Sequence, residues 1–303
     1  QSVSGIKAFV SIMRGCNNFC SYCIVPYTRG REVSRQSADI ISEIEAASLS
    51  GVKEVTLLGQ NVNSYGTSGG GDVSFHELLR MVSAVSGIKR VRFVTSHPKD
   101  ISEELIELFG TEKKLCRHLH LPVQSGSDAV LERMGRGYTR AAYLNMIDKI
   151  KTLYPDMSVT TDIIVGFPGE TEGDFEATMG LLRTVRFDNI FSFMYSPRPD
   201  TRAASFDGQL APEVRTERLQ ILQEEQKAIT FARNREKVGR AMEVLVEGPS
   251  KADPDELMGR TSCNRIVNFA SPPGIETGPG TVIEVLVTDA YPNSLRGRAK
   301  GNH

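Results

Sequence analysis

Three cysteines lie within eight positions near the start of the chain, and thiols at such short spacing can hold a metal centre. Cys16, Cys20 and Cys23 follow the pattern Cys-x3-Cys-x2-Cys. A structural zinc site normally has four ligands, and no fourth Cys or His lies near these three in the sequence. Three thiolates match an iron–sulfur cluster that leaves one iron open to a further ligand. The spacing favours such a cluster, with a zinc site as the alternative.

The remaining composition limits the class of protein. Cys116 and Cys263 stand alone, and we expect them to be buried as small apolar residues. Five cysteines in 303 residues is an odd and low number, typical of a reducing compartment, so we expect a cytoplasmic protein. No apolar run approaches the roughly 18 residues that span a bilayer, so we expect no membrane contact. A net charge of −1 means that any nucleic-acid contact needs a local basic patch.

Alternating strands and helices are expected to position the cysteines. Short apolar runs at 7–13, 54–58, 90–95, 117–121, 158–165 and 189–195 predict strands, and amphipathic segments between them predict helices. This alternation is typical of an α/β fold with parallel strands and right-handed crossovers. Six such units are fewer than the eight of a closed barrel. A partial (β/α)6 barrel and an open doubly wound sheet both fit the pattern.

The pattern changes near residue 240. A long polar helix is predicted over 212–238, and five short runs follow at 242–246, 257–261, 265–269, 281–289 and 294–300. Pro and Gly separate these runs, which predicts a small antiparallel β-barrel. We therefore expect a first domain over 1–239, including the linking helix, and a second domain over 240–303.

Several motifs together resemble a known family. Cys-x3-Cys-x-Tyr-Cys after a first strand resembles the radical S-adenosylmethionine (SAM) superfamily, in which three cysteines hold a 4Fe–4S cluster and its fourth iron chelates SAM. The stretch GCNNFCSYCIVPYTRGREVSR at 15–35 is most similar to the MiaB-type methylthiotransferases. These convert isopentenyladenosine beside the tRNA anticodon into its 2-methylthio derivative. The similarity continues through HLPVQSGS at 120–127, TDIIVGFPGET at 161–171 and YSPRP at 195–199. The last domain is similar to the TRAM domain, an RNA-binding module.

The resemblance implies roles for particular residues. Cys16, Cys20 and Cys23 are the implied cluster ligands, and no catalytic residue beyond the cluster is assigned. The residues implied to bind SAM are Tyr22, Gln60, Gln124, Ser125, Arg136, Asp162 and Gly166. Within this set, Arg136 pairs with the methionine carboxylate, and Arg133 is its nearby rival. The sequence departs from the family pattern at two places: Gly59-Gln60-Asn61 stands where Gly-Gly-Glu is frequent, and Gly135 stands where Asn is usual.

RNA contact is expected at two places. Arg29 and Arg31 follow the cysteine loop and could meet phosphate, or could pair with local carboxylates. From residue 238 to the end the chain has 7 Lys and Arg against 8 Asp and Glu, so binding there needs a local cluster. The candidates on the small barrel are Arg260, Arg265, Arg296, Arg298 and Lys300.

The resemblance also implies a reaction and partners. The cluster cleaves SAM to methionine and a 5′-deoxyadenosyl radical, and a second SAM donates the methyl group. The sulfur comes from an auxiliary 4Fe–4S cluster on a separate N-terminal domain. This sequence has no such cysteine set, so we expect a fragment that lacks that domain. The expected partners are the tRNA anticodon stem-loop and an electron donor such as flavodoxin or ferredoxin, with the protein a monomer.

Three other functions fit parts of the pattern. A sister methylthiotransferase acts on threonylcarbamoyladenosine in tRNA or on a ribosomal-protein aspartate, although the segment PYTRGRE at 26–32 favours the isopentenyladenosine type. A radical SAM enzyme without sulfur chemistry is a second alternative. A zinc-containing RNA-binding module without catalysis is the third.

Overall fold

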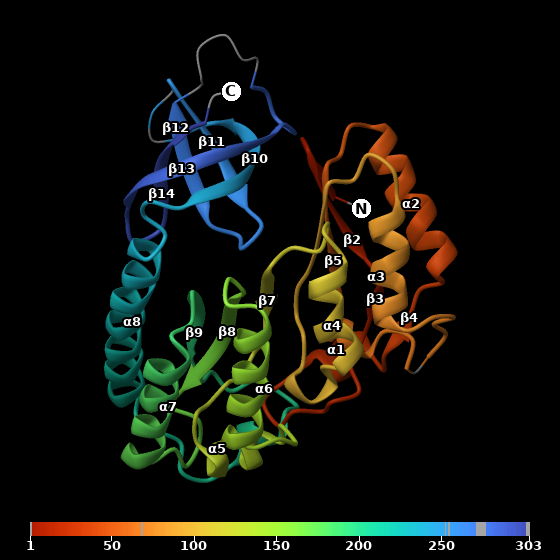
Figure 1. The fold of residues 1–303 in the computed structure, drawn as a ribbon. Helices are drawn as coiled ribbons and strands as arrows, with labels where there is room; N and C mark the ends of the chain where they lie inside the picture. Colours follow the sequence, from red (N-terminus) through yellow and green to blue (C-terminus); the bar gives the residue numbers. More distant parts are fainter. Residues whose placement is uncertain (1, 68, 252, 254, 271–276, 301–303) are drawn as a thin grey trace.

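The structure is a computed structural model that describes residues 2–67, 69–251, 253, 255–270 and 277–300. Figure 1 shows two parts: a large βα array, and a small β-barrel joined to it by the long helix α8 (Pro212–Arg235). Within the described residues no helix is both long and apolar enough to cross a bilayer.

The first half of the array is a four-stranded sheet. Its order is β1 (Ser2–Ser4), β2 (Lys7–Ser11), β5 (Glu54–Leu58) and β6 (Arg90–Phe93). β2, β5 and β6 are parallel, and β1 is an antiparallel edge strand that the sequence patterns did not indicate. The helices between them are α2 (Ser37–Leu49), α3 (Phe75–Ala84) and α4 (Glu103–Thr111). Alternate apolar residues of the strands, among them Val10 and Leu57, are fully buried in the main core with these helices.

The second half is a parallel three-stranded sheet of β7 (His118–His120), β8 (Ser158–Val165) and β9 (Asn189–Met194). Its helices are α5 (Asp128–Met134), α6 (Arg140–Leu153), α7 (Glu172–Val185) and α8. A parallel bridge between Val91 and Leu115 joins the halves. The six parallel strands follow one another in sequence order, whereas a doubly wound sheet reverses its order. The predicted partial (β/α)6 barrel is therefore confirmed.

The cysteine segment is enclosed by a two-stranded pairing. β3 (Met13–Arg14) pairs antiparallel with β4 (Val33–Ser34), so the strand expected over 7–13 is interrupted after Ser11. Between them lies the short helix α1 (Val25–Arg29). The two ends of the loop over 15–32 therefore lie side by side in space.

Single-turn 3-10 helices occupy Val62–Ser64, Pro98–Asp100 and Arg202–Ser205, outside the cysteine segment.

The C-terminal domain is a closed barrel. Its strands are β10 (Ala241–Pro249), β11 (Glu256–Thr261), β12 (Ile266–Ala270), β13 (Val282–Ala290) and β14 (Leu295–Ala299), in the order β10-β11-β12-β14-β13. Its interior includes Val246, Phe269 and Val287. The predicted small barrel is confirmed, but β12 and β14 are parallel. A closed barrel with an odd number of strands cannot be antiparallel throughout, so one parallel pair is required.

The small barrel packs against the amino-terminal ends of the parallel strands. Arg92 of β6 donates to the carbonyl oxygens of Ser262 (2.9 Å) and Thr261 (2.8 Å). Lys7 of β2 pairs with Glu247, with 2.5 Å between Nζ and Oε1. The cysteine loop lies at the opposite edge of the array, beyond the carboxyl-terminal ends of the parallel strands. The loop and the small barrel are therefore on opposite edges of the array (Figure 1).

Candidate functional site

The cysteine loop folds tightly on itself at its base. Gly15 has φ +74°, and a Cβ there would lie 2.1 Å from the carbonyl oxygen of Arg31. The Cys16 amide donates to the Gly30 carbonyl (3.2 Å), and the Cys23 amide to the Cys20 carbonyl (3.0 Å). Only glycine fits at position 15, where the backbone is left-handed and the Arg31 carbonyl leaves no room for a Cβ. The Gly-Cys start of the motif is therefore a backbone requirement of the loop.

The three thiols face a common, partly dry environment. Cys20 is buried, and Cys16 and Cys23 are half-buried. Burial raises the pKa of the Cys16 and Cys23 thiols, and the nearby Cys20 raises both further. Among the described residues, no three Cys, His, Asp or Glu converge on a single ion, so a mononuclear zinc site gains no support. In an iron–sulfur cluster the thiolates bind different irons, so they need not converge on one point.

Arg136 lies directly beside these thiols. It is buried, and its Nη1 is 3.4 Å from both Cys20 Sγ and the Tyr22 hydroxyl. Nη2 donates to the Pro122 carbonyl (2.7 Å), and Nε to the Tyr138 hydroxyl (2.9 Å). Burial works against the charge, yet neighbouring Tyr22, Tyr138 and Cys20 raise the pKa of Arg136, so it stays cationic. The result is a fixed positive charge next to the cysteines.

The end of α5 explains why Arg136, and not Arg133, reaches this place. Gly135 caps the helix at φ +71°, ψ +38°, a left-handed conformation that glycine favours. The chain therefore turns after Met134 and sends Arg136 toward the cysteine loop. Arg133 instead donates to the carbonyls of Pro168 (3.0 Å) and Asp207 (3.3 Å).

Buried polar atoms without partners gather at the same edge. Gln60 Oε1 after β5, and Ser96 Oγ and His97 Nε2 after β6, have no hydrogen-bond partner within the described part of the chain. His97 Nδ1 accepts from the Lys99 amide (3.3 Å), so Nε2 carries the hydrogen. Burial, with Arg136 and Lys99, lowers the pKa of His97 to about 2, which keeps the ring neutral. An unpaired buried polar atom costs about 1–3 kcal/mol, so a ligand or water that bonds to these three atoms would be favoured.

These observations fit a site-differentiated 4Fe–4S cluster with SAM. In such a site the thiols would supply three ligands, and Arg136 would supply a cation for a carboxylate. Gln60, just after β5, would supply an unpaired carbonyl acceptor for an ammonium group.

Other predicted cofactor residues lie differently. The Gln124 backbone, at φ +75°, extends the β7–β8 pairing by bonding to Asp162 and Ile164. Ser125 is fully buried, and its hydroxyl lies 3.3 Å from Thr178 Oγ1. The Ser125 hydroxyl therefore fixes the turn before α5 and is not presented to a ligand.

Asp162 and Gly166 also have local partners. Asp162 lies midway along β8, with Oδ1 3.2 Å from His120 Nε2, so its side chain pairs with a histidine of β7. Gly166 has φ +69°, and a Cβ there would lie 2.3 Å from Cγ of Arg215. The close approach at Gly166 is therefore made by an α8 side chain.

The candidate RNA-binding residues divide into two groups. Arg29 and Arg31 are exposed on the cysteine loop, and Arg31 stacks over the Phe19 ring at 4.6 Å. A second exposed set lies on the outer surface of the small barrel, along β14 and just after it, namely Arg296, Arg298 and Lys300. Arg296 pairs with Glu256 (2.8 Å) and Lys300 with Glu284 (3.1 Å), with both cations at the surface, where such pairs exchange readily with solvent or phosphate.

Two of the candidates already pair with carboxylates, Arg265 across the domain contact and Arg260 within the small barrel. Arg265 is buried in an ion pair with Asp188. Arg260 pairs with Glu247, with 3.3 Å between Nε and Oε1. Arg265 is therefore unavailable to RNA phosphate in this arrangement, because its charge is already matched inside the protein.

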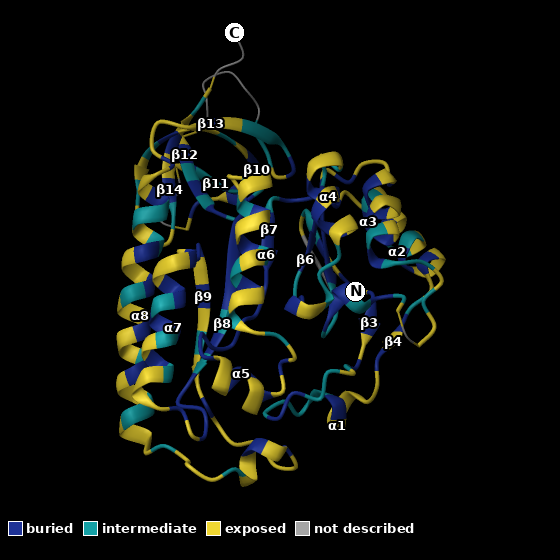
Figure 2. Ribbon diagram, turned by 60° about the horizontal axis from the view of Figure 1, so that its bottom comes forward, coloured by how far each residue is buried: buried dark blue, intermediate teal, exposed yellow. Residues whose placement is uncertain are grey.

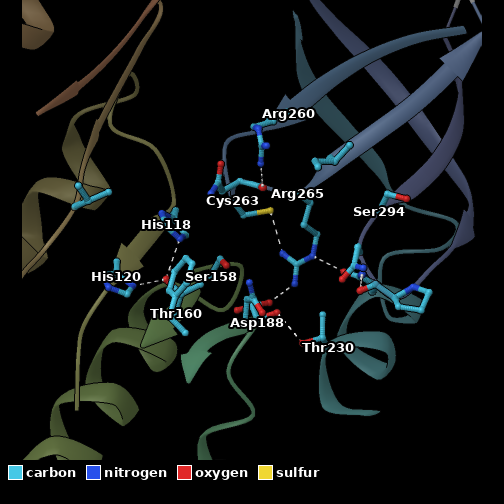
Figure 3. Close-up of a pocket in the computed structure, with 18 of the residues that line it drawn as sticks. His118, His120, Ser158, Thr160, Asp188, Thr230, Arg260, Cys263, Arg265 and Ser294 are labelled. Carbon is cyan, nitrogen blue, oxygen red and sulfur yellow. Dashed lines mark hydrogen bonds and ion pairs between the residues drawn. The ribbon is translucent and has the colours of Figure 1, made fainter. Parts of the chain in front are cut away.

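A cavity between the domains was not indicated by the sequence motifs. It has a volume of about 530 Å³ and is lined by His118, His120, Thr160 and Phe191 of the βα array, and by Arg265 of the small barrel. Figure 3 shows both histidines joined to Thr160 and Arg265 reaching Asp188. One sequence signal could have pointed to this cavity. His-x-His in a strand of a parallel sheet is unusual, because such strands are usually apolar on both faces.

Comparisons with known proteins show the family to which the chain belongs. The chain matches the radical SAM superfamily over residues 10–182 and the TRAM domain over 235–300. The chain therefore belongs to the radical SAM superfamily. It is 54% identical over 293 residues to the tRNA-2-methylthio-N(6)-dimethylallyladenosine synthase of Geobacter metallireducens, covering 97% of this chain and 66% of that protein. The synthase of the same name from Syntrophus aciditrophicus is 52% identical, covering 96% and 63%. The chain spans about two thirds of the length of these curated relatives.

Solved structures show the same fold at low identity. The radical SAM methyltransferase TsrM from Kitasatospora setae, solved with cobalamin and a [4Fe-4S] cluster, superposes with TM-score 0.54 and 18% identity, covering 65% of this chain and 38% of that one. Coproporphyrinogen III oxidase from Escherichia coli gives TM-score 0.52 and 12% identity, covering 84% and 65%.

Proposed function

We propose that this chain is the radical SAM and RNA-binding portion of a tRNA methylthiotransferase that modifies carbon 2 of isopentenyladenosine next to the anticodon. The observation that carries the proposal is the buried Arg136 beside Cys20 in a three-cysteine loop. The chain is also 54% and 52% identical to two tRNA-2-methylthio-N(6)-dimethylallyladenosine synthases. Neither a bare metal-binding module nor an RNA-binding barrel needs a buried cation beside its thiols.

The chain's own residues divide the work of holding the cofactors. Cys16, Cys20 and Cys23 bind the cluster, and Arg136 pairs with the carboxylate of SAM. The Gln60 carbonyl accepts from the methionyl amine, and Tyr22 packs beside both groups. When bound, the cluster and SAM supply a 5′-deoxyadenosyl radical, and the protein orients it and excludes water.

The remaining parts of the reaction come from outside this sequence. The methyl group is supplied by a second SAM, and the sulfur by an auxiliary 4Fe–4S cluster on a further segment. Flavodoxin or ferredoxin is the class of electron donor, and the enzyme works as a cytoplasmic monomer. The adenine leaves its stack to reach the site, as bases do in enzymes that modify them. The cysteine loop and β14 offer Arg29, Arg31, Arg296, Arg298 and Lys300 to the RNA backbone.

Analysis of tRNA nucleosides tests the proposed function. Mass spectrometry of tRNA from a strain lacking the gene is expected to show loss of 2-methylthio-isopentenyladenosine and accumulation of isopentenyladenosine. Unchanged 2-methylthio-isopentenyladenosine would reject the proposal. A change confined to threonylcarbamoyladenosine or to a ribosomal protein would identify a sister enzyme instead.

Replacing Arg136 separates its role from that of its neighbour. Arg136→Met is expected to weaken SAM binding to the cluster-loaded protein about 10- to 100-fold, because a charge-assisted hydrogen bond to the carboxylate is lost. Arg136→Lys should recover part of the affinity, since it keeps the charge but not the planar fork.

Equilibrium SAM titration provides the measurement, with iron content confirming that the cluster is loaded. Arg133→Met is the matched control and should leave the SAM affinity unchanged. Equal losses in the two Met variants would contradict the assignment of Arg136.

A further inference from the structure

One face of the second half-sheet lines the inside of the partial barrel. Ile190 of β9 is buried in the main core, and the Ser192 hydroxyl accepts from Gln223 of α8 (3.2 Å). Because side chains alternate along a strand, Phe191 and Phe193 point the opposite way, into the barrel interior. They form an aromatic strip on the edge strand of this sheet.

The aromatic strip is unusually exposed for its position. Phe191 is 53% exposed and Phe193 is 52% exposed, and Figure 2 shows the exposed positions along β9. Neighbouring exposed apolar side chains that form one patch mark an interaction surface or a ligand-binding groove. Two phenylalanines on one strand offer successive flat faces to a planar ligand.

A polar pair lies beside the aromatic strip. In the β8–β9 register Asp162 is opposite Phe191, and the His120 ring meets the Phe191 ring edge-on, with 5.6 Å between centroids. His120 Nδ1 lies 3.0 Å from Thr160 Oγ1, and its Nε2 faces Asp162. The Asp162 side chain is 28% exposed. A carboxylate held in this way can accept a hydrogen bond from an exocyclic N–H of a base.

The strip connects two sites already described. Phe191 and His120 line the cavity of about 530 Å³ between the domains, a volume within the usual range for ligand pockets of about 300–1,000 Å³. At the other end, Phe193 is opposite Ile164, which packs with Tyr22 against the same small apolar cluster. A flat ligand on the strip therefore lies between the small barrel and the cysteine loop.

We propose that Phe191 and Phe193, with the His120–Asp162 pair, hold the purine base of the RNA substrate by stacking and by one hydrogen bond to the carboxylate. The assignment rests on the proposed function for the identity of the RNA, and it makes the strip a substrate-binding element of this chain. Stacking tolerates different bases, whereas the Asp162 carboxylate favours a base that presents an N–H donor.

Fluorescent RNA tests the base site without requiring turnover. The probe is an anticodon stem-loop with 2-aminopurine, whose emission falls on stacking, in place of the adenine to be modified. Titration into the reconstituted holoenzyme is expected to quench the probe. Phe191→Ala and Phe193→Ala should each weaken binding about 5- to 150-fold, the range for loss of one aromatic stacking partner. Their Tyr variants keep the aromatic face and should restore both binding and quenching.

Phe231 of α8 provides the matched control, because it is also exposed, at 38%, and does not line the cavity. Phe231→Ala should bind and quench like the unchanged protein. Wild-type affinity and quenching in the Phe191→Ala Phe193→Ala double variant would overturn the base site. Loss of quenching in that variant, together with unchanged tRNA nucleosides in the deletion strain, would keep the base site and reject only the proposed reaction.

Discussion

Cys20→Ala is expected to give a protein that holds no intact 4Fe–4S cluster and no longer cleaves SAM. Cys20 is the buried member of the three cysteines and the one that Arg136 touches, at 3.4 Å. Removing it takes away one of three thiolate ligands and leaves the guanidinium facing a small void. The cluster supplies the electron for cleavage, so activity falls to background and does not decline in proportion to stability.

Iron and sulfide analysis after anaerobic reconstitution, together with 5′-deoxyadenosine formation, measures this effect. Cys116→Ala and Cys263→Ala are the matched controls. Both cysteines are buried near the domain contact, beside Arg92. Because they lie away from the cysteine loop, these variants should keep the cluster. A Cys20→Ala protein with full iron content and SAM cleavage would refute the assignment of the site.

The repeating part of the fold was predictable because the residues buried in each helix or strand recur in the sequence at the period of that element. All six parallel strands and the five strands of the small barrel lie where apolar runs are bounded by Gly, Pro or polar residues. The pairings β1–β2 and β3–β4 were not foreseen, because each involves only two or three residues of one strand. These pairings depend on neighbours that the local pattern does not contain.

The candidate site was predictable only where its residues follow one another in a motif. Cys16, Cys20 and Cys23 are close in the chain, and the turn at Gly135 carries Arg136 to them. Ser125 and Arg265 were assigned by type, but Thr178 and Asp188 decide where their polar groups go. Such partners lie 53 and 77 residues away, beyond the reach of any local pattern.

The attachment of the small barrel gives the second large prediction, which concerns Asp188. This carboxylate pairs with Arg265 of the small barrel and with Arg233 of α8, and it accepts from the Val159 amide (3.0 Å). Asp188→Asn keeps the shape but leaves the buried Arg265 guanidinium without its anion, while Arg233 keeps Glu236 (3.2 Å) as a partner. Breaking one side of a buried ion pair typically costs about 3–5 kcal/mol, and the free energy of unfolding should fall by that amount.

Urea denaturation measures the loss, and Asp156→Asn is the control. Asp156 also pairs with two cations, Lys237 and Arg240, but its side chain is 74% exposed. Solvent screening limits such pairs to below about 1 kcal/mol. Equal losses in the Asp188→Asn and Asp156→Asn variants would show that the domain contact does not depend on the buried charge.

The pH dependence follows from the same contact. Burial alone raises the pKa of Asp188, but Arg265 and Arg233 outweigh it and hold that pKa below its ordinary value of 3.8. A carboxylate with a depressed pKa in the folded state stabilises the protein above its unfolded pKa, and this contribution disappears as the pH falls through the folded value. The difference in unfolding free energy between the unchanged protein and Asp188→Asn should therefore be full at neutral pH and shrink below about pH 4. A difference that stays constant down to pH 2 would mean that the Asn variant is destabilised by lost hydrogen bonds and not by lost charge.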